Sequence, residues 1–108
     1  MPIRGNLQSS DTAPDTGEHT TELLRLRNLM IEQILSGTTE PHDYRQNQDE
    51  WVLVLSGHAT LDVAGETLEL TTNDWLLLPA GTPHTLLHTE PGTNWLAIHL
   101  FPEPAPER

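Results

Sequence analysis

The chain has 108 residues, a length that suits one domain with a single hydrophobic core. It contains no cysteine, which excludes disulfides, thiolate zinc sites and iron–sulfur clusters, and all five basic residues are arginine, so no lysine is available for Schiff-base chemistry. The net charge of −11 disfavours nucleic acids and anionic membranes as partners. No apolar stretch approaches the ~20 residues of a membrane-spanning helix, so we expect a cytoplasmic protein.

The two ends of the chain differ in composition from its centre. Residues 1–21 are mostly polar beyond Leu7 and predict a flexible N-terminal arm, because they offer little apolar surface to bury. Residues 102–108 alternate proline with other residues, which predicts an extended, unpaired tail. The folded domain is therefore predicted to span residues 22–101.

Within that domain, residues 21–27 contain good helix formers and predict a short helical turn. From residue 29 onward, short apolar runs alternate with turn residues, a pattern typical of an all-β sandwich or barrel. The predicted strands cover residues 29–36, 50–56, 58–63, 67–70, 74–78, 83–89 and 94–101.

Two of these strands are apolar on both alternating faces. They contain residues 51–55 and 75–78, which include two of the three tryptophans. One face of such a strand lines the interior, and the other needs a cover. We expect a second copy of the chain to supply it, which predicts a homodimer.

Two sequence motifs lie within the predicted strands and turns. Glu50 and Gly57 have the spacing of the second half of the first cupin motif, Gly-x5-His-x-His-x(3 or 4)-Glu-x6-Gly. The spacing of the second motif, Gly-x5-Pro-x-Gly-x2-His-x3-Asn, is matched by Asn73, Pro79, Gly81, His84 and His88. Over residues 29–101 the chain thus resembles small single-domain cupins. The resemblance implies an all-β fold, a double-stranded β-helix or jelly-roll barrel, here with a short N-terminal extension.

The resemblance also implies a divalent transition metal, Fe, Mn, Ni or Zn, bound by three histidines and one glutamate. Glu50 and His84 occupy two of the ligand positions. The positions expected for the two histidines of the first motif hold either Asp43 with Arg45 or Tyr44 with Gln46, depending on the spacing. His42 lies close to them in a turn-rich segment, and with Glu50 and His84 it would complete a site of two histidines and one carboxylate.

Further candidates for the pocket are His88, Tyr44 and Arg45. His88 would share a strand face with His84, but about 13 Å of strand separates their Cα atoms, so we expect it to line the pocket rather than to share an ion. Tyr44 and Arg45 are expected near the mouth, where the arginine would bind a carboxylate or phosphate of a small ligand. His58 is predicted to be exposed, and His99 is left unassigned because its strand is apolar on both faces.

Three hypotheses of function remain open from the sequence. The first is a metal-dependent cupin acting on a small organic molecule, as a dioxygenase or isomerase would. The second is a metal-free barrel that binds a small molecule as a sensor or carrier, which the missing histidine pair favours. The third is a dimeric interaction module with a filled interior. The fold alone does not choose among them.

Overall fold

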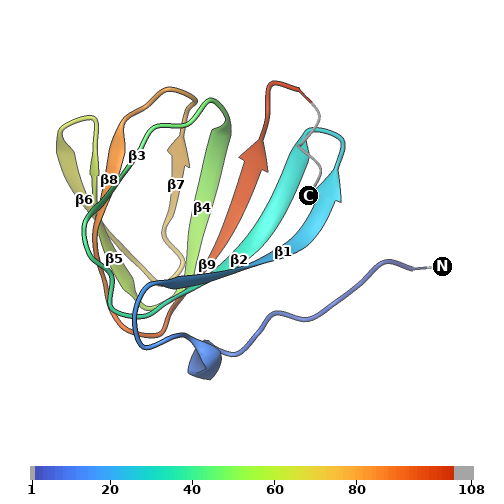
Figure 1. Cartoon of the computed structure of the whole chain (residues 1–108), viewed down its shortest axis with the longest axis horizontal. Helices are drawn as coiled ribbons and strands as arrows, with labels where there is room; N and C mark the ends of the chain where they lie inside the picture. Colours follow the sequence, from blue (N-terminus) through green and yellow to red (C-terminus); the bar gives the residue numbers. More distant parts are fainter. Residues whose placement is uncertain (1, 104–108) are drawn as a thin grey trace.

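Two antiparallel sheets that face each other account for most of residues 2–103, the part of the chain that the computed structural model describes (Figure 1). The larger sheet has the strand order β1 (Glu18–Leu26), β2 (Leu29–Ser36), β9 (Thr93–Leu100), β4 (Asp49–Ser56) and β7 (Trp75–Leu78). The smaller sheet has the order β3 (His42–Tyr44), β8 (His84–Thr89), β5 (His58–Val63) and β6 (Glu66–Thr71). A short 3-10 helix, η1 (Ser10–Thr12), precedes them.

The connections between the sheets confirm the predicted jelly-roll barrel. After β2 the chain passes repeatedly from one sheet to the other, so that strands distant in sequence, such as β2 and β9 or β4 and β7, become hydrogen-bonded neighbours. All seven predicted strands are present, with ends within one residue of the expected positions. No helix among residues 2–103 is long and apolar enough to cross a membrane.

The first strand corrects the sequence prediction. The helical turn expected at residues 21–27 is wrong, because these residues lie in or directly after β1, which pairs with β2 in a hairpin. Arg27 in the connecting turn has a φ of 52°. The ladder with β2 overrides the helix propensity of the leucines. Strand β1 also begins inside the segment expected to be flexible, and the short strand β3 was not predicted.

The N-terminal extension is held against the outer face of the larger sheet. Gln33, on β2, is only 1% exposed and both accepts from the backbone N–H of Gln8 at 2.8 Å and donates to its carbonyl at 2.9 Å. The same side-chain amide donates to Asn94 on β9, which in turn donates to Ser10. Residues 8–10 therefore cover part of this face. Of the predicted tail at 102–108, residues 104–108 lie outside the described residues.

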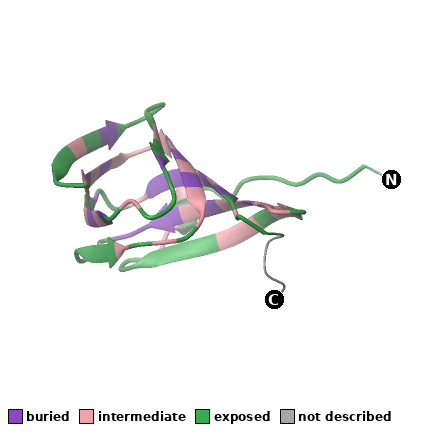
Figure 2. Ribbon diagram, turned by 90° about the horizontal axis from the view of Figure 1, so that it is seen from above, coloured by how far each residue is buried: buried purple, intermediate pink, exposed green. Residues whose placement is uncertain are grey.

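The hydrophobic core lies between the two sheets (Figure 2). It is formed by inward-facing side chains of both sheets, namely Val52, Val54, Ala59, Leu61, Leu70, Leu86, Trp95 and Ala97. These residues alternate along their strands with side chains on the outer faces, as the two-residue period of a strand requires. Burial of this apolar surface stabilises the barrel and fixes which residues of each strand point inward.

The motif glycines and Asp49 hold the loops around the interior. Gly57 has a φ of 105°, and a Cβ atom there would lie 2.4 Å from Thr93 Oγ1, so the turn between β4 and β5 requires glycine. The N–H of Gly81 donates to the carbonyl of Gln46 at 2.8 Å, and the N–H of Ala80 donates to Asp49 Oδ1 at 2.8 Å. These contacts join the loop before β4 to the loop before β8.

Candidate functional site

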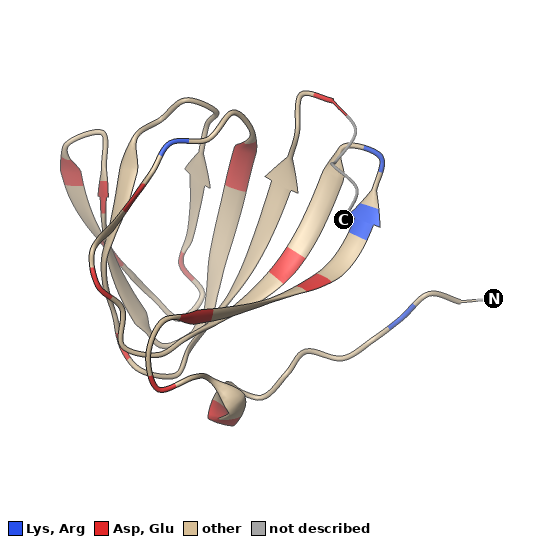
Figure 3. Ribbon diagram, in the orientation of Figure 1, with Lys and Arg blue, Asp and Glu red and all other residues tan. Residues whose placement is uncertain are grey.

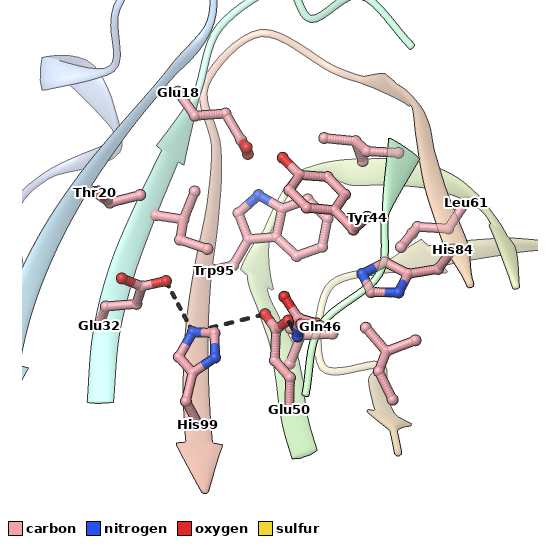
Figure 4. Close-up of a pocket in the computed structure, with 14 residues that line it drawn as sticks. Glu18, Thr20, Glu32, Tyr44, Gln46, Glu50, Leu61, His84, Trp95 and His99 are labelled. Atoms are coloured by element: carbon pink, nitrogen blue, oxygen red, sulfur yellow. Dashed lines mark hydrogen bonds and ion pairs between the residues drawn. The ribbon is translucent and has the colours of Figure 1, made fainter. Parts of the chain in front are cut away.

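A cavity of about 200 Å³ lies between the sheets and is lined by residues of both (Figure 4). One part of its wall is apolar and consists of Ile34, Val52, Leu61, Leu78, Leu86 and Trp95. The polar part has three carboxylates, Glu18, Glu32 and Glu50. Five further polar or ionisable side chains complete it, those of Thr20, Tyr44, Gln46, His84 and His99. The cavity thus combines an apolar wall with a concentrated set of groups capable of proton transfer or hydrogen bonding.

Glu50 points into this cavity because it alternates in phase with Val52 and Val54 on β4. The residue is 9% exposed, and its Oε1 accepts a hydrogen bond from Gln46 Nε2 at 2.7 Å. No described residue donates to Glu50 Oε2. Because the described residues contain no fully buried polar side-chain atom without a partner, this oxygen is accessible from the cavity. Glu50 therefore offers a ligand an acceptor to which no described residue donates a hydrogen bond.

His84 and Tyr44 face the cavity as a pair from the smaller sheet. They are opposite each other in the β3–β8 register, and their rings stack with centroids 5.3 Å apart and planes 13° apart. His84 Nδ1 lies 3.1 Å from the carbonyl of Thr82, which can only accept, so Nδ1 carries the proton and Nε2 is the acceptor of the neutral ring. Burial, followed by the charges of Glu18, Glu50 and Glu32, raises the pKa of Tyr44, which keeps the phenol protonated.

His99, which the sequence left unassigned, is part of the cavity wall. It lies opposite Glu50 in the β4–β9 register. Its Nε2 is 3.0 Å from Glu32 Oε1 and 3.9 Å from Glu50 Oε2 (Figure 4). Burial alone would lower the pKa of the imidazole, but the hydrogen bond to Glu32 and the charges of Glu50 and Glu32 outweigh it and raise the pKa. Both carboxylates therefore favour a proton on Nε2, and Gln48 Nε2, which can only donate, lies 3.3 Å from Nδ1 on the other side of the ring.

Glu18 and Glu32 were also missed by sequence reasoning. Glu18 begins β1 at the mouth of the cavity, and although the residue is exposed, its Oε2 reaches inward to accept from the fully buried Ser36 Oγ at 2.7 Å. Removal of water from the carboxylate raises the pKa of Glu18 despite that hydrogen bond, and the charges of Glu32 and Glu50 add to the effect. Glu32 carried one signal, since it is the single charged residue of its strand.

The remaining predicted site residues do not line the cavity. His42 is exposed on β3, with its ring centroid 4.5 Å from that of Tyr44. Arg45 is exposed and borders an adjoining surface groove, which shares Tyr44 and His84 with the cavity. The prediction that His88 shares a face with His84 is wrong, because the pairing of β8 with β5 shifts between Leu86 and His88, and this bulge leaves His88 exposed.

The structure decides between the two alternatives for the first-motif positions, since Tyr44 and Gln46 both line the cavity with Glu50 and His84. This donor set does not fit a tightly bound transition metal. The phenol is held protonated, and the amide of Gln46 directs its N–H toward Glu50, which leaves one carboxylate and one imidazole. Among residues 2–103, no three His, Cys, Asp or Glu side chains are grouped so that they could hold a metal ion.

Comparisons with known proteins place the chain in one family. A family model described as a cupin domain matches residues 30–99. No curated protein gives a significant match.

Solved structures of similar fold include a protein of Ralstonia eutropha JMP134 named as a putative mannose-6-phosphate isomerase. It is 33% identical, the match covers 93% of this chain and 99% of that one, and the TM-score is 0.71. A cupin superfamily protein of Desulfitobacterium hafniense DCB-2 is 19% identical, with 94% of each chain covered and a TM-score of 0.75. KdgF from Halomonas sp. is 17% identical, with 84% and 82% covered and a TM-score of 0.69.

Proposed function

The chain belongs to the cupin domain family, and we propose that its barrel binds a small organic molecule directly, without a transition metal. One observation carries this proposal. A single cavity joins Glu50 and His84 with a phenol and an amide at the positions where the family motif has histidines. A pocket with an apolar wall and a few convergent polar groups is the usual form of a small-molecule site.

Each polar group would have a distinct part in binding. Glu50 Oε2 accepts no hydrogen bond from the described residues, its nearest charged neighbour being His99 Nε2 at 3.9 Å, and the protonated Tyr44 hydroxyl offers a donor. The side chains of Leu61, Leu86 and Trp95 would contact the apolar part of the ligand. The polar groups therefore fix orientation, while the apolar wall contributes most of the buried area.

The metal-dependent alternative rests on the fact that Glu50 and His84 line the same cavity. It requires a third ligand. His42, the predicted one, is exposed and does not line the cavity, and Tyr44, whose ring is tilted by 57° against that of His42, lies on the cavity side. The interaction module with a filled interior is disfavoured by the cavity volume, which is enough for several water molecules or a small ligand.

We also propose that a second copy of the chain covers the outer face of the larger sheet. Beyond the area that residues 8–10 cover, this face exposes Trp75 by 62% and Leu77 by 51%, and Trp75 lies 6.2 Å from Trp51, centroid to centroid. An apolar strip of this kind on a small domain is more stable when buried in a two-fold interface.

A ligand screen tests the proposed function. Thermal unfolding would be recorded in EDTA with a panel of amines, sugars and organic acids, for the native chain, Glu50→Gln and the control Glu66→Gln. Glu66 is exposed at the start of β6 and does not line the cavity. We expect a compound that stabilises the native chain and Glu66→Gln but not Glu50→Gln. A panel in which every stabilising compound acts equally on all three proteins, or acts only after metal is added, would refute the proposal.

A further inference from the structure

The cavity contains more negative than positive charge. Three carboxylates line it, together with two histidines and no arginine among the described residues, and, despite burial, the two carboxylates beside His99 raise the pKa of that imidazole. None of the described arginines, Arg4, Arg25, Arg27 and Arg45, lines it. Acidic residues lie on β1, β2 and β4, whereas the arginines lie on the N-terminal extension, at the end of β1 and in loops (Figure 3). An anionic ligand would thus meet uncompensated repulsion.

The hydrogen-bonding capacity of the cavity is equally one-sided. Each of the three carboxylates uses one oxygen internally, with Ser36, His99 or Gln46 as its donor. The second oxygen of each accepts no hydrogen bond from residues 2–103. Glu50 gives the clearest case, because the residue is nine-tenths buried while its Oε2 remains open to the cavity. Against these open carboxylate oxygens the wall sets the Tyr44 hydroxyl as a donor, so its unused acceptors outnumber that donor.

The protein already places a nitrogen donor among these carboxylates. His99 Nε2 lies between Glu32 and Glu50, at 3.0 Å and 3.9 Å from their nearest oxygens. The longer of these distances is beyond hydrogen-bonding range, so Glu50 is only partly satisfied by this contact. An N–H group of the ligand can therefore donate a hydrogen bond to Glu50 Oε2.

We infer that the ligand of this cavity carries a protonated amine on an apolar body, and that the ammonium group is bound by Glu50 beside the Glu32–His99 pair (Figure 4). This inference rests on the proposed function and names its ligand class. An ammonium has three donors and no acceptor, which matches the unfilled oxygens. Trp95 and Tyr44 lie in the same wall and present aromatic surface that favours a cation.

The same argument disfavours a sugar phosphate. Phosphate would need arginine, lysine or clustered backbone N–H donors, and no described arginine lines the cavity. The name of the similar Ralstonia eutropha protein, a putative mannose-6-phosphate isomerase, implies a sugar phosphate as substrate. The cavity of this chain lacks, among the described residues, the arginine that would bind such a phosphate. Repulsion among the carboxylates, which contributes to the raised pKa of Glu18, would be relieved by a bound cation.

Three probes of one shape test the inference by isothermal titration calorimetry at neutral pH in EDTA. Cyclohexylammonium, cyclohexanol and cyclohexanecarboxylate share the same ring and differ only in the polar group. We expect the ammonium to bind at least about tenfold more tightly than the alcohol, and the carboxylate not to bind. Glu50→Gln should lower the affinity for the ammonium about tenfold and change that for the alcohol little, while Glu66→Gln should change neither.

The outcomes separate this inference from the proposed function. If the alcohol or the carboxylate binds at least as well as the ammonium and Glu50→Gln alters that binding, the cavity is a ligand site but not one for cations. If the ammonium binds equally to Glu50→Gln and the native chain, it binds elsewhere and the inference fails. If none of the probes binds, the inference fails, and the broader ligand screen decides the proposed function.

Discussion

Gln46 Nε2 donates a hydrogen bond to Glu50 Oε1 across 2.7 Å, from the position at which the cupin motif carries its second histidine. A metal ligand there would present a lone pair to an ion, whereas the amide presents an N–H to the glutamate. Glu50 is thereby held in place without a metal, and its other oxygen stays open to the cavity.

Restoring the two motif histidines should create a metal site. We expect the double variant Tyr44→His/Gln46→His to retain close to one equivalent of Ni(II) or Zn(II) after gel filtration, because it completes a set of three histidines and Glu50. The measurement is elemental analysis, and Gln46→His alone is the control. A double variant that retains no more metal than the native chain would show that the barrel geometry, not the donor set, prevents binding.

Gln33 should determine whether the N-terminal extension stays attached. Gln33→Leu removes both hydrogen bonds to the backbone of Gln8 and leaves buried polar groups unpaired, so we expect a loss of about 1–3 kcal/mol in the free energy of unfolding. Amide exchange of residues 8–12 should also become faster. Gln8→Ala is the matched control, because Gln8 uses only its backbone in these contacts. Equal exchange in the native chain and Gln33→Leu would contradict the docked arrangement.

The pH dependence of stability should change in Glu18→Gln. Because the pKa of Glu18 is raised above its ordinary value of 4.5 in the folded chain, its contribution to stability is fully present below that value and is lost as the pH rises through the raised pKa. A glutamine at this position does not ionise, so the variant does not lose this stability as the pH rises. Urea unfolding from about pH 4 to about pH 7 should therefore show the variant gaining stability relative to the native chain. A difference that is constant, or that shrinks toward neutral pH, would argue against a desolvated carboxylate.

The outer face of the larger sheet should govern self-association. Light scattering after size-exclusion chromatography is expected to give a dimer mass for the native chain and a monomer mass for Trp75→Arg, since a charge placed in an apolar interface is costly. Thr67→Arg introduces the same charge at an exposed position of β6 and should stay dimeric. A native chain that is monomeric at all accessible concentrations would refute the dimer.

The strands were predictable because their signal is local. Short apolar runs bounded by turn residues located all seven predicted strands, and two motif spacings placed Glu50 and His84 in one cavity. The prediction for residues 21–27 was wrong because it also relied on local signals. The leucines of this segment favour a helix locally, and only pairing with β2 makes it a strand.

The rest of the site depends on contacts that no local pattern reveals. Glu18 reaches the cavity because the first hairpin places β1 beside β2, and the strand of His99 is apolar on both faces, so alternation could not orient it. His88, by contrast, was predicted to line the cavity and does not. A regular strand would align it with His84, but one bulge reverses its direction.

Elemental analysis of untagged protein tests the central claim, that the cavity binds its ligand without a transition metal. The native chain and His84→Ala would each be incubated with Fe(II), Mn(II), Ni(II) or Zn(II), passed through gel filtration and compared. We expect both proteins to retain far less than one equivalent of any metal. Retention of close to one equivalent by the native chain, lost in His84→Ala, would contradict the claim and establish the metal-dependent alternative.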